Sequence, residues 1–228
     1  LRLRRLLVKL CAQEKELTLM LLIDTSRSMR FGKPDKLWMA ARFAAVLAGI
    51  ALNDGNRAGI ATVGKSLREL VKPERNRVSL TAILNALSRL ETVDSFDPAR
   101  CLREFAARYG RKCMVVLISD LLYPEWSQTI RNLASSGCEG YILQLLAPEE
   151  LEPPYLDEVT LVDQENATEV GVYMDRETAR GYRTELARYL LEVRQTCHRL
   201  GLGHTMAATD DLLGRVFHEE LRKGGLLC

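Results

Sequence analysis

The chain has 228 residues, 47% of them hydrophobic, which is long enough for one α/β domain with a sizeable core. Its 32 lysines and arginines nearly balance its 30 aspartates and glutamates, and this argues against a nucleic-acid-binding protein held mainly by phosphate contacts. The six cysteines have no C-x-x-C spacing and there are three histidines, so the composition argues against a zinc cluster and favours reduced thiols in a cytosol-facing protein.

Strands and helices alternate along the first half of the chain. The apolar segment LTLMLLI is typical of a strand that is covered on both faces, and the turn NDGN separates a helix from the next strand. The expected strands are residues 3–11, 17–23, 57–63 and 66–72. The expected helices run from Pro34 to about Leu52 and over residues 75–90.

The second half continues the same alternation. The expected strands are CMVVLIS, GYILQLL and HTMAA, and the expected helices begin at Pro98, near residue 125, at Asp175 and at Asp210. Residues 155–174 are expected to form a hairpin insertion at the edge of the sheet. This order predicts one domain over residues 1–228 with a Rossmann-like, doubly wound, mostly parallel sheet and helices on both faces.

The stretch GIATVGKS, Gly59 to Ser66, matches the nucleotide-binding pattern G-x-x-x-x-G-K-[ST]. A phosphate-binding loop needs a strand before its first glycine and a helix that starts after its lysine. Here the turn NDGN leaves no room for that strand, and Pro73 follows too soon for that helix. We therefore interpret the stretch as a strand, a turn and an edge strand, and keep a nucleotide hydrolase as a weaker alternative.

The longest apolar stretch, Leu37 to Leu52, is interrupted by Arg42 and is shorter than the ~20 residues that span a bilayer. It predicts a buried helix, and we expect no membrane span in this chain. Because the sequence starts at Leu1, part of the N-terminus is expected to be missing. The expected location is cytoplasmic, and membrane association through an upstream segment stays open.

Polar side chains gather where two buried strands end. In LLIDTSRSM, Asp24, Ser26 and Ser28 follow the strand at alternating positions, and LISD places Asp120 after another buried strand. Ligands in open α/β sheets bind outside the carboxyl ends of the strands. Carboxylates, hydroxyls and water are suitable ligands for a hard divalent cation, so the pattern suggests a metal site, with an ordinary capping loop as the alternative.

These segments, with NRAGIATVG and MVVLISD, resemble a von Willebrand factor A domain. Together with LAPEEL they resemble more narrowly the bacterial family called domain of unknown function fifty-eight. The resemblance implies a metal-ion-dependent adhesion site in which Ser26 and Ser28 ligate Mg²⁺ or Mn²⁺ and Asp24 and Asp120 act directly or through water. It also implies a non-catalytic module that binds an acidic side chain of a protein partner and works as an adaptor or assembly factor with a MoxR-type AAA+ ATPase.

The chain departs from the family pattern at one ligand position. The family has a threonine in the loop before the helix that leads to MVVLISD, and this alignment puts Phe96 there. Ser95 is the expected substitute, with Thr92 and Asp97 as alternatives. If none substitutes, the protein is a scaffold with a degenerate metal site.

Three further sets of side chains and one further function bear on the predicted site. Arg27 and Arg30 can attract an acidic partner or simply be solvated. The aromatic residues Phe31, Tyr123 and Trp126 can form a rim for a partner or pack against neighbouring loops. His198 and His204 are expected to be structural. A phosphohydrolase with an Asp24 nucleophile would need a second carboxylate at position 26, which is serine, and a lysine near the metal, which the sequence does not identify.

Overall fold

The computed structural model describes residues 17–75, 77–110, 113–153, 158–162, 169–173 and 175–216. Within these ranges six strands form one sheet in the order β3-β2-β1-β4-β5-β8. The strands are β1 (Thr18–Asp24), β2 (Arg57–Val63), β3 (Leu67–Glu74), β4 (Met114–Ser119), β5 (Glu139–Leu146) and β8 (Gly203–Ala208). All neighbours are parallel except β3, which runs antiparallel to β2 at one edge. The predicted mostly parallel sheet is therefore confirmed.

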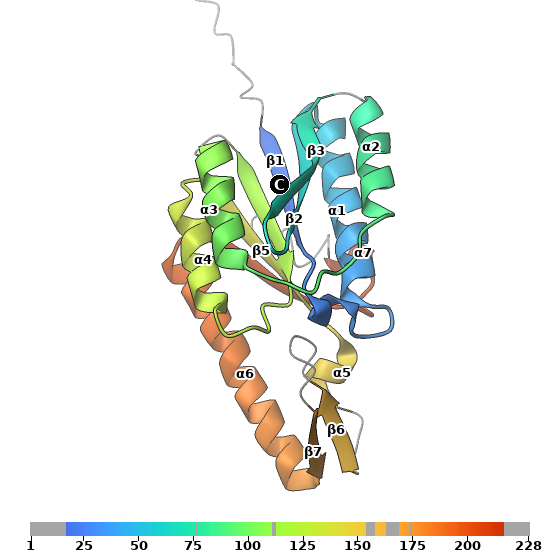
Figure 1. Cartoon of the computed structure of the whole chain (residues 1–228), viewed down its shortest axis with the longest axis vertical. Coiled ribbons are helices and arrows are strands. Elements are labelled where there is room, and N and C mark those ends of the chain that lie inside the picture. The colour runs from blue at the N-terminus through green and yellow to red at the C-terminus, as the bar shows by residue number, and fades with distance from the viewer. Residues whose placement is uncertain are drawn as a thin grey trace, which may run out of the picture.

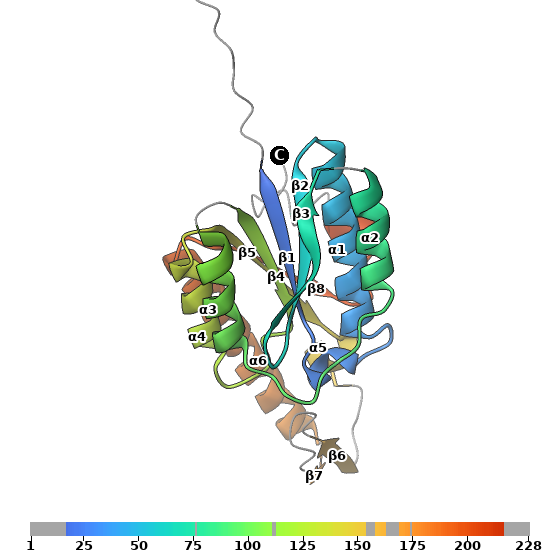
Figure 2. The ribbon, with the colours of Figure 1, turned by 45° about the horizontal axis from the view of Figure 1, so that its top comes forward.

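Helices cover both faces of the sheet, as Figures 1 and 2 show. On one face lie α1 (Lys36–Asn53) and α2 (Arg77–Leu87), and on the other lie α3 (Pro98–Tyr109), α4 (Trp126–Ser135) and α6 (Arg176–Arg199). Two apolar clusters fill the spaces between helices and sheet, one under α1 and α2 and the other under α3, α4 and α6. Burial on both faces explains why β1 and β4 have almost continuous apolar sequences.

Helix α1 packs into the core although its length and composition would also allow it to cross a membrane. Half of it is buried, including Phe43 and Ala44, which contact the same apolar cluster as the sheet. Asp35 caps the helix, since its side chain accepts a hydrogen bond of 2.7 Å from Trp38 N. The prediction of a buried helix is confirmed, and the helix starts two residues after Pro34.

The stretch Gly59 to Ser66 is a strand followed by a turn. Gly59 to Val63 belong to β2, Gly64 to Ser66 form the turn, and β3 begins at Leu67. A helix N-terminus after Lys65 is what a phosphate-binding loop requires, and an extended strand stands in its place. The nucleotide hydrolase alternative is therefore wrong for this stretch.

The hairpin prediction needs a correction. Strands β6 (Glu158–Val162) and β7 (Glu169–Tyr173) pair antiparallel, but they form a separate two-stranded sheet and do not extend the main sheet. Both views place them beyond the main sheet, near the start of α6 (Figures 1 and 2). Asp175 caps α6 as expected, and its side chain accepts from Thr178 N at 2.7 Å.

The predicted bounds of one helix and one strand need correction, and a further predicted strand is not tested. The last described helix, α7, spans Leu213–Arg215, so the expected start at Asp210 is wrong by three residues. β3 continues to Glu74, because Pro73 is tolerated in an edge strand. The strand expected at residues 3–11 lies outside the described residues.

Candidate metal-binding site

The adjacent strands β1 and β4 bring Asp24 and Asp120 to one edge of the sheet. The strands are parallel with Ile23 paired to Ile118, so Asp24 lies level with Ser119, and Asp120 follows directly. Both aspartates are buried, with at most 1% of their surface exposed. Two carboxylates that are close together and shielded from water favour a bound cation.

The loop after β1 adds two hydroxyl groups to Asp24. The backbone N–H of Ser26 donates to Asp24 Oδ1 at 2.8 Å, and Ser119 Oγ donates to Asp24 Oδ2 at 2.5 Å. Ser26 Oγ and Ser28 Oγ lie 3.0 Å apart, at the start of the short helix η1 (Arg27–Arg30). The structure therefore brings Asp24, Ser26 and Ser28 together, as their alternating positions suggested.

The electrostatic environment of Asp24 disfavours its charge. Burial, and then the neighbouring Asp120, raise its pKa from 3.8 to about 7, while hydrogen bonds from Ser119 and Ser26 act in the opposite direction. A divalent cation beside Asp24 would favour the ionised form. Carboxylate and hydroxyl oxygens suit Mg²⁺ or Mn²⁺, so this donor set fits the cation that the resemblance implies. Within the described residues, histidine, cysteine, aspartate and glutamate form no group of three or more that could hold a metal ion, so the proposed donor set depends on the serine hydroxyls.

A tight turn after β4 holds Asp120. Leu122 N donates to Asp120 Oδ1 at 3.0 Å, and Leu121 N donates to Ser119 Oγ at 3.0 Å. Leu121 has φ of 57°, a left-handed conformation that is uncommon for a side chain of its size and that is seen often at functional sites. Tyr189 from α6 donates its hydroxyl to Leu121 O at 2.5 Å, which ties the turn to the long helix.

Asp120 also forms a buried ion pair that the sequence did not predict. Lys36 Nζ lies 2.7 Å from Asp120 Oδ2 and 2.5 Å from Glu150 Oε1, and the lysine side chain is completely buried. Burial alone would lower the pKa of Lys36, but the two carboxylates raise it above its usual value, so the ammonium stays charged. Burial raises the pKa of Glu150, against the effect of Lys36.

The loop of residues 91–97 runs beside the site. Val93 N donates to Thr25 O at 2.8 Å, and this bond brings the loop to the segment that carries Ser26. The expected ligand Ser95 lies in this loop with an exposed side chain. Asp97 is engaged as the cap of α3, where it accepts from Arg100 N at 2.9 Å. Ser95 therefore lies exposed in the loop beside the site, and its role as a ligand stays a prediction, whereas Asp97 has another role as the cap of α3.

The aromatic side chains near the carboxyl ends of the strands differ in packing and exposure. The ring of Phe96, which replaces the family threonine, packs edge-on against Tyr123 at a centroid distance of 5.0 Å. Trp126 packs in the same way against Tyr189 of α6, at 5.6 Å. Phe31 is 40% exposed and is the most exposed of the three proposed rim residues, since Trp126 is half-buried and Tyr123 is buried. For Tyr123 and Trp126 the packing alternative is confirmed.

The arginines, the buried histidine and the cysteines of the sequence prediction have different environments. Arg27 forms an ion pair of 2.9 Å with Asp94 of the neighbouring loop, and Arg30 is exposed. His204 Nε2 lies 3.1 Å from Gln144 Oε1, and burial followed by Arg194 lowers its pKa to about 4, consistent with a neutral structural histidine. The four described cysteines are free and buried, as expected for reduced thiols.

Sequence reasoning missed Ser119, Lys36 and Glu150. Ser119 could have been found from its position beside Asp120, because neighbouring residues at a strand end reach the same edge. Lys36 carried no signal, since a lysine in the first turn of a helix is normally solvated. It is the lysine near the site that the phosphohydrolase alternative required, but it is held between two carboxylates, and position 26 still lacks a carboxylate.

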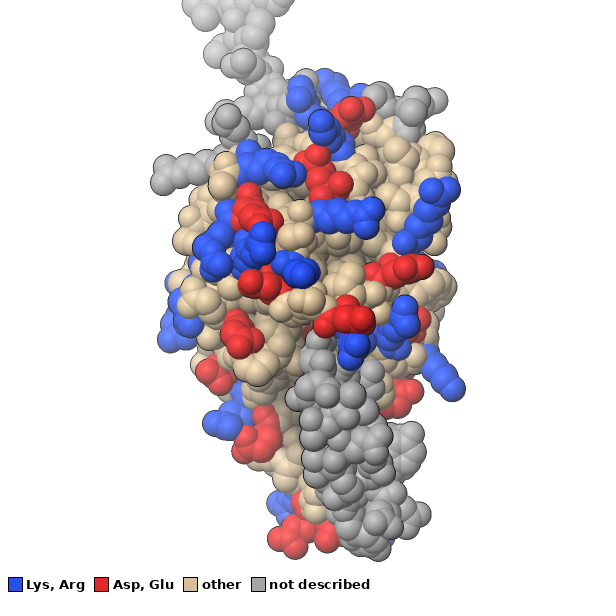
Figure 3. Space-filling view, viewed as in Figure 1, with Lys and Arg blue, Asp and Glu red and all other residues tan. Residues whose placement is uncertain are grey.

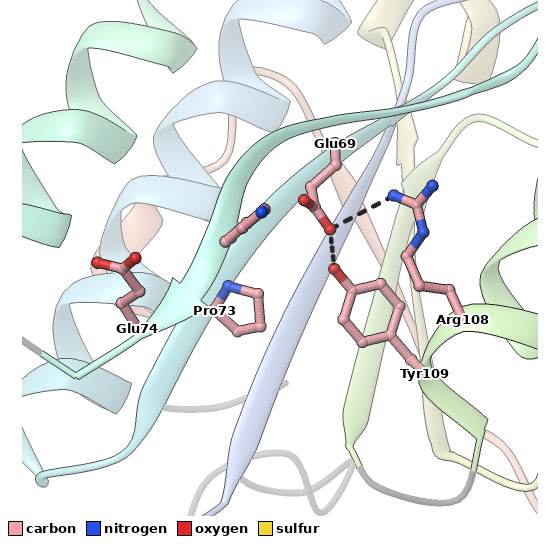
Figure 4. Close-up of a pocket in the computed structure, with 6 residues that line it drawn as sticks. Glu69, Pro73, Glu74, Arg108 and Tyr109 are labelled. Carbon is pink, nitrogen blue, oxygen red and sulfur yellow. Dashed lines mark hydrogen bonds and ion pairs between the residues drawn. The ribbon is translucent and has the colours of Figure 1, made fainter.

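The described cavities differ in their distance from the site. One of about 400 Å³ adjoins it, and its lining includes Thr25, Lys65, Arg68 and Arg89. A larger one of about 620 Å³ lies between β3 and the end of α3, where Glu69 accepts from the Tyr109 hydroxyl and faces Arg108 (Figure 4). Basic and acidic side chains are interspersed on the face shown in Figure 3, as the balanced composition suggests.

The mostly parallel six-stranded sheet, with helices on both faces, is the α/β architecture that the resemblance to a von Willebrand factor A domain leads us to expect. The chain belongs to the family described as protein of unknown function DUF58, which matches residues 1–191. It is 24% identical over 222 residues to the uncharacterised protein Rv1480 of Mycobacterium tuberculosis, covering 93% of this chain and 70% of that protein.

Solved structures resemble this fold at low sequence identity. The conserved hypothetical protein BatB from Bacteroides thetaiotaomicron superposes with a TM-score of 0.56 at 11% identity, over 92% of this chain and 99% of that one. A von Willebrand factor type A structure from Catenulispora acidiphila gives a TM-score of 0.43 at 17% identity, over 76% and 42% of the two chains. At 11% identity the likeness to BatB concerns the fold alone.

Proposed function

We propose that this protein is a non-catalytic protein-binding module with a metal-ion-dependent adhesion-type site. Asp24, Ser26 and Ser28 hold Mg²⁺ or Mn²⁺, Asp120 contributes through water, and Ser95 is the proposed donor from the loop of residues 91–97. The observation that carries the proposal is the meeting of two buried carboxylates and two hydroxyls at one edge of the sheet. The metal attracts a carboxylate of the partner and does no chemistry on it.

The surroundings of the site suit an acidic partner. The adjoining cavity has Lys65, Arg68 and Arg89 in its lining, with Glu91 as the acidic member. Positive side chains beside a metal attract a segment that has several carboxylates, and they increase the rate of its association. Phe31, exposed after η1, offers an apolar contact for the same partner.

The proposed partner is a MoxR-type AAA+ ATPase, for which the protein acts as an adaptor or assembly factor in the cytoplasm. The resemblance of LLIDTSRSM and LAPEEL to the DUF58 family supports this choice. An acidic segment of the ATPase would supply the carboxylate. Membrane association through an upstream segment is a further proposal.

The partner proposal is tested by immobilising a MoxR-type ATPase from the same genome and measuring binding by interferometry. Binding is expected in millimolar Mg²⁺, and it should be lost in chelator and in Ser28→Ala. Charge reversal at Lys65 and Arg89 should weaken it, whereas reversal at Lys72, which lines the distant cavity, should not. Binding that persists unchanged in chelator would contradict a metal-mediated contact.

A scaffold that works without metal is the second candidate. It is favoured by Phe96 at the position of the family threonine and by Lys36, which already compensates the charge of Asp120. In that case the same partner would bind equally well in Mg²⁺ and in chelator, and Ser28→Ala would have no effect. The interferometry experiment therefore separates the two candidates.

A further inference from the structure

Lys36 is a charged residue whose side chain is fully buried. It is the first residue of α1, and it heads the group of the largest fully buried side chains. The ring centroid of Phe31 lies 5.9 Å from Nζ, beside the two carboxylates of Asp120 and Glu150. A buried ammonium is tolerated only where opposite charges compensate it, so its position depends on these acids.

Both acids are held on both of their oxygens. Asp120 accepts from Leu122 N on Oδ1 and from Lys36 on Oδ2. Glu150 accepts from Lys36 on Oε1 and from Ala147 N on Oε2 at 2.7 Å. The protein therefore fixes the orientation of Asp120 with its own groups, and one positive charge is already present beside it.

This arrangement differs from that of Asp24. The bonds to Asp24 come from a backbone N–H and a hydroxyl, which are neutral donors. The two carboxylates of the site thus have different counter-charges: Asp120 has an ammonium from the chain, and Asp24 has none in direct contact among the described residues.

We propose that Lys36 is a positioning residue of the metal site and serves as a resident cation for Asp120. The Lys36 ammonium fixes the orientation of the Asp120 carboxylate and balances its negative charge. The fold therefore persists when the metal leaves. The metal is then held mainly by Asp24, Ser26 and Ser28, with reduced affinity because Lys36 competes for the charge of Asp120. This inference rests on the proposed metal site and adds that the metal is readily exchangeable.

The test compares Lys36→Met with the parent in two measurements. Thermal unfolding is followed in chelator and in Mn²⁺, and free Mn²⁺ is titrated by electron paramagnetic resonance. In the variant we expect the Mn²⁺ dissociation constant to fall about tenfold, because a unit positive charge is removed from beside the ion in a low-dielectric site. The variant should melt lower than the parent in chelator and recover most of the difference in Mn²⁺, because the metal replaces the missing charge.

One further variant serves as a control and another as a second test. Met39→Ala removes a buried apolar side chain from the next turn of α1 and should lower the melting temperature without changing Mn²⁺ affinity. Glu150→Gln removes one of the two charges that compensate Lys36 and should weaken Mn²⁺ binding. A purely structural role for Lys36 would give no change of affinity in either Lys36→Met or Glu150→Gln.

The outcomes separate this inference from the proposed function. If the parent binds Mn²⁺ and Lys36→Met binds it no more tightly, the role of Lys36 is overturned while the metal site stands. If Lys36→Met binds Mn²⁺ and the parent does not, the resident cation is supported and the metal-assisted function fails. If Lys36→Met is unfolded in chelator, Mn²⁺ should refold it, and a variant unfolded under both conditions overturns the inference.

Discussion

Replacing Asp24 with asparagine should stabilise the metal-free protein at neutral and alkaline pH. The carboxyl group is buried, and its pKa is raised from 3.8 to about 7, first by burial and then by Asp120. Each pKa unit corresponds to about 1.4 kcal/mol, so ionised Asp24 costs the folded state about 4 kcal/mol at pH 8. Asparagine removes this cost and keeps the shape of the side chain.

The hydrogen bonds of Asp24 survive this substitution in large part. The amide oxygen can accept from Ser26 N, and the Ser119 hydroxyl can rotate to accept from the amide nitrogen. Coupling to Asp120 and imperfect replacement of these bonds reduce the gain. We therefore expect Asp24→Asn to be about 2–4 kcal/mol more stable than the parent at pH 8 in chelator.

Urea unfolding between pH 3.5 and 8 in chelator measures this effect. Because the pKa of Asp24 is raised on folding, its contribution to stability is fully present below about pH 4 and is lost as the pH rises to about 7. The variant's advantage should therefore grow by up to about 1.4 kcal/mol per pH unit in that window and then stay constant. A difference independent of pH, or a parent more stable at pH 8, would refute the reasoning.

Three other predictions concern the fold and the excluded nucleotide function. Phe43→Ala, in the core under α1, should lower the free energy of unfolding by about 3–5 kcal/mol in urea, and an effect under about 1 kcal/mol would contradict its complete burial. Gly203→Ala should cost about 1–3 kcal/mol, since the new methyl group would lie 2.2 Å from the Tyr141 ring, whereas Gly49→Ala, with open space around it, should not destabilise. Calorimetric titration with ATP should give no binding heat for the parent or for Lys65→Ala, and heat that depends on Lys65 would restore the nucleotide-binding alternative.

The sequence predicted the sheet because apolar periodicity and turn residues act locally. LTLMLLI and CMVVLIS are buried on both faces, and NDGN and Gly201 end their elements as expected. The hairpin of β6 and β7 was predicted as a pair, but sequence pattern does not say which sheet a pair joins. The late start of α7 reflects the usual uncertainty of helix boundaries in short segments.

The sequence predicted those residues of the candidate site that directly follow the end of a strand. Asp24 and Asp120 were placed together because the carboxyl ends of parallel strands meet at one edge. Lys36 was not predictable, because its partners are 84 and 114 residues away in sequence and nothing in its own helix marks it as buried. The position of Ser95 relative to the metal also depends on a loop conformation that pattern cannot specify.

The most direct test of the account is calorimetric titration of the parent and of Ser28→Ala with Mg²⁺ and Mn²⁺. Ser28 Oγ lies 3.0 Å from Ser26 Oγ, and we expect removal of this hydroxyl to leave Asp24 and the fold in place. The account predicts binding heat at about one ion per chain for the parent and a loss of that heat in Ser28→Ala. Absence of heat in both proteins, or equal heat in both, would contradict a metal site built from Asp24, Ser26 and Ser28.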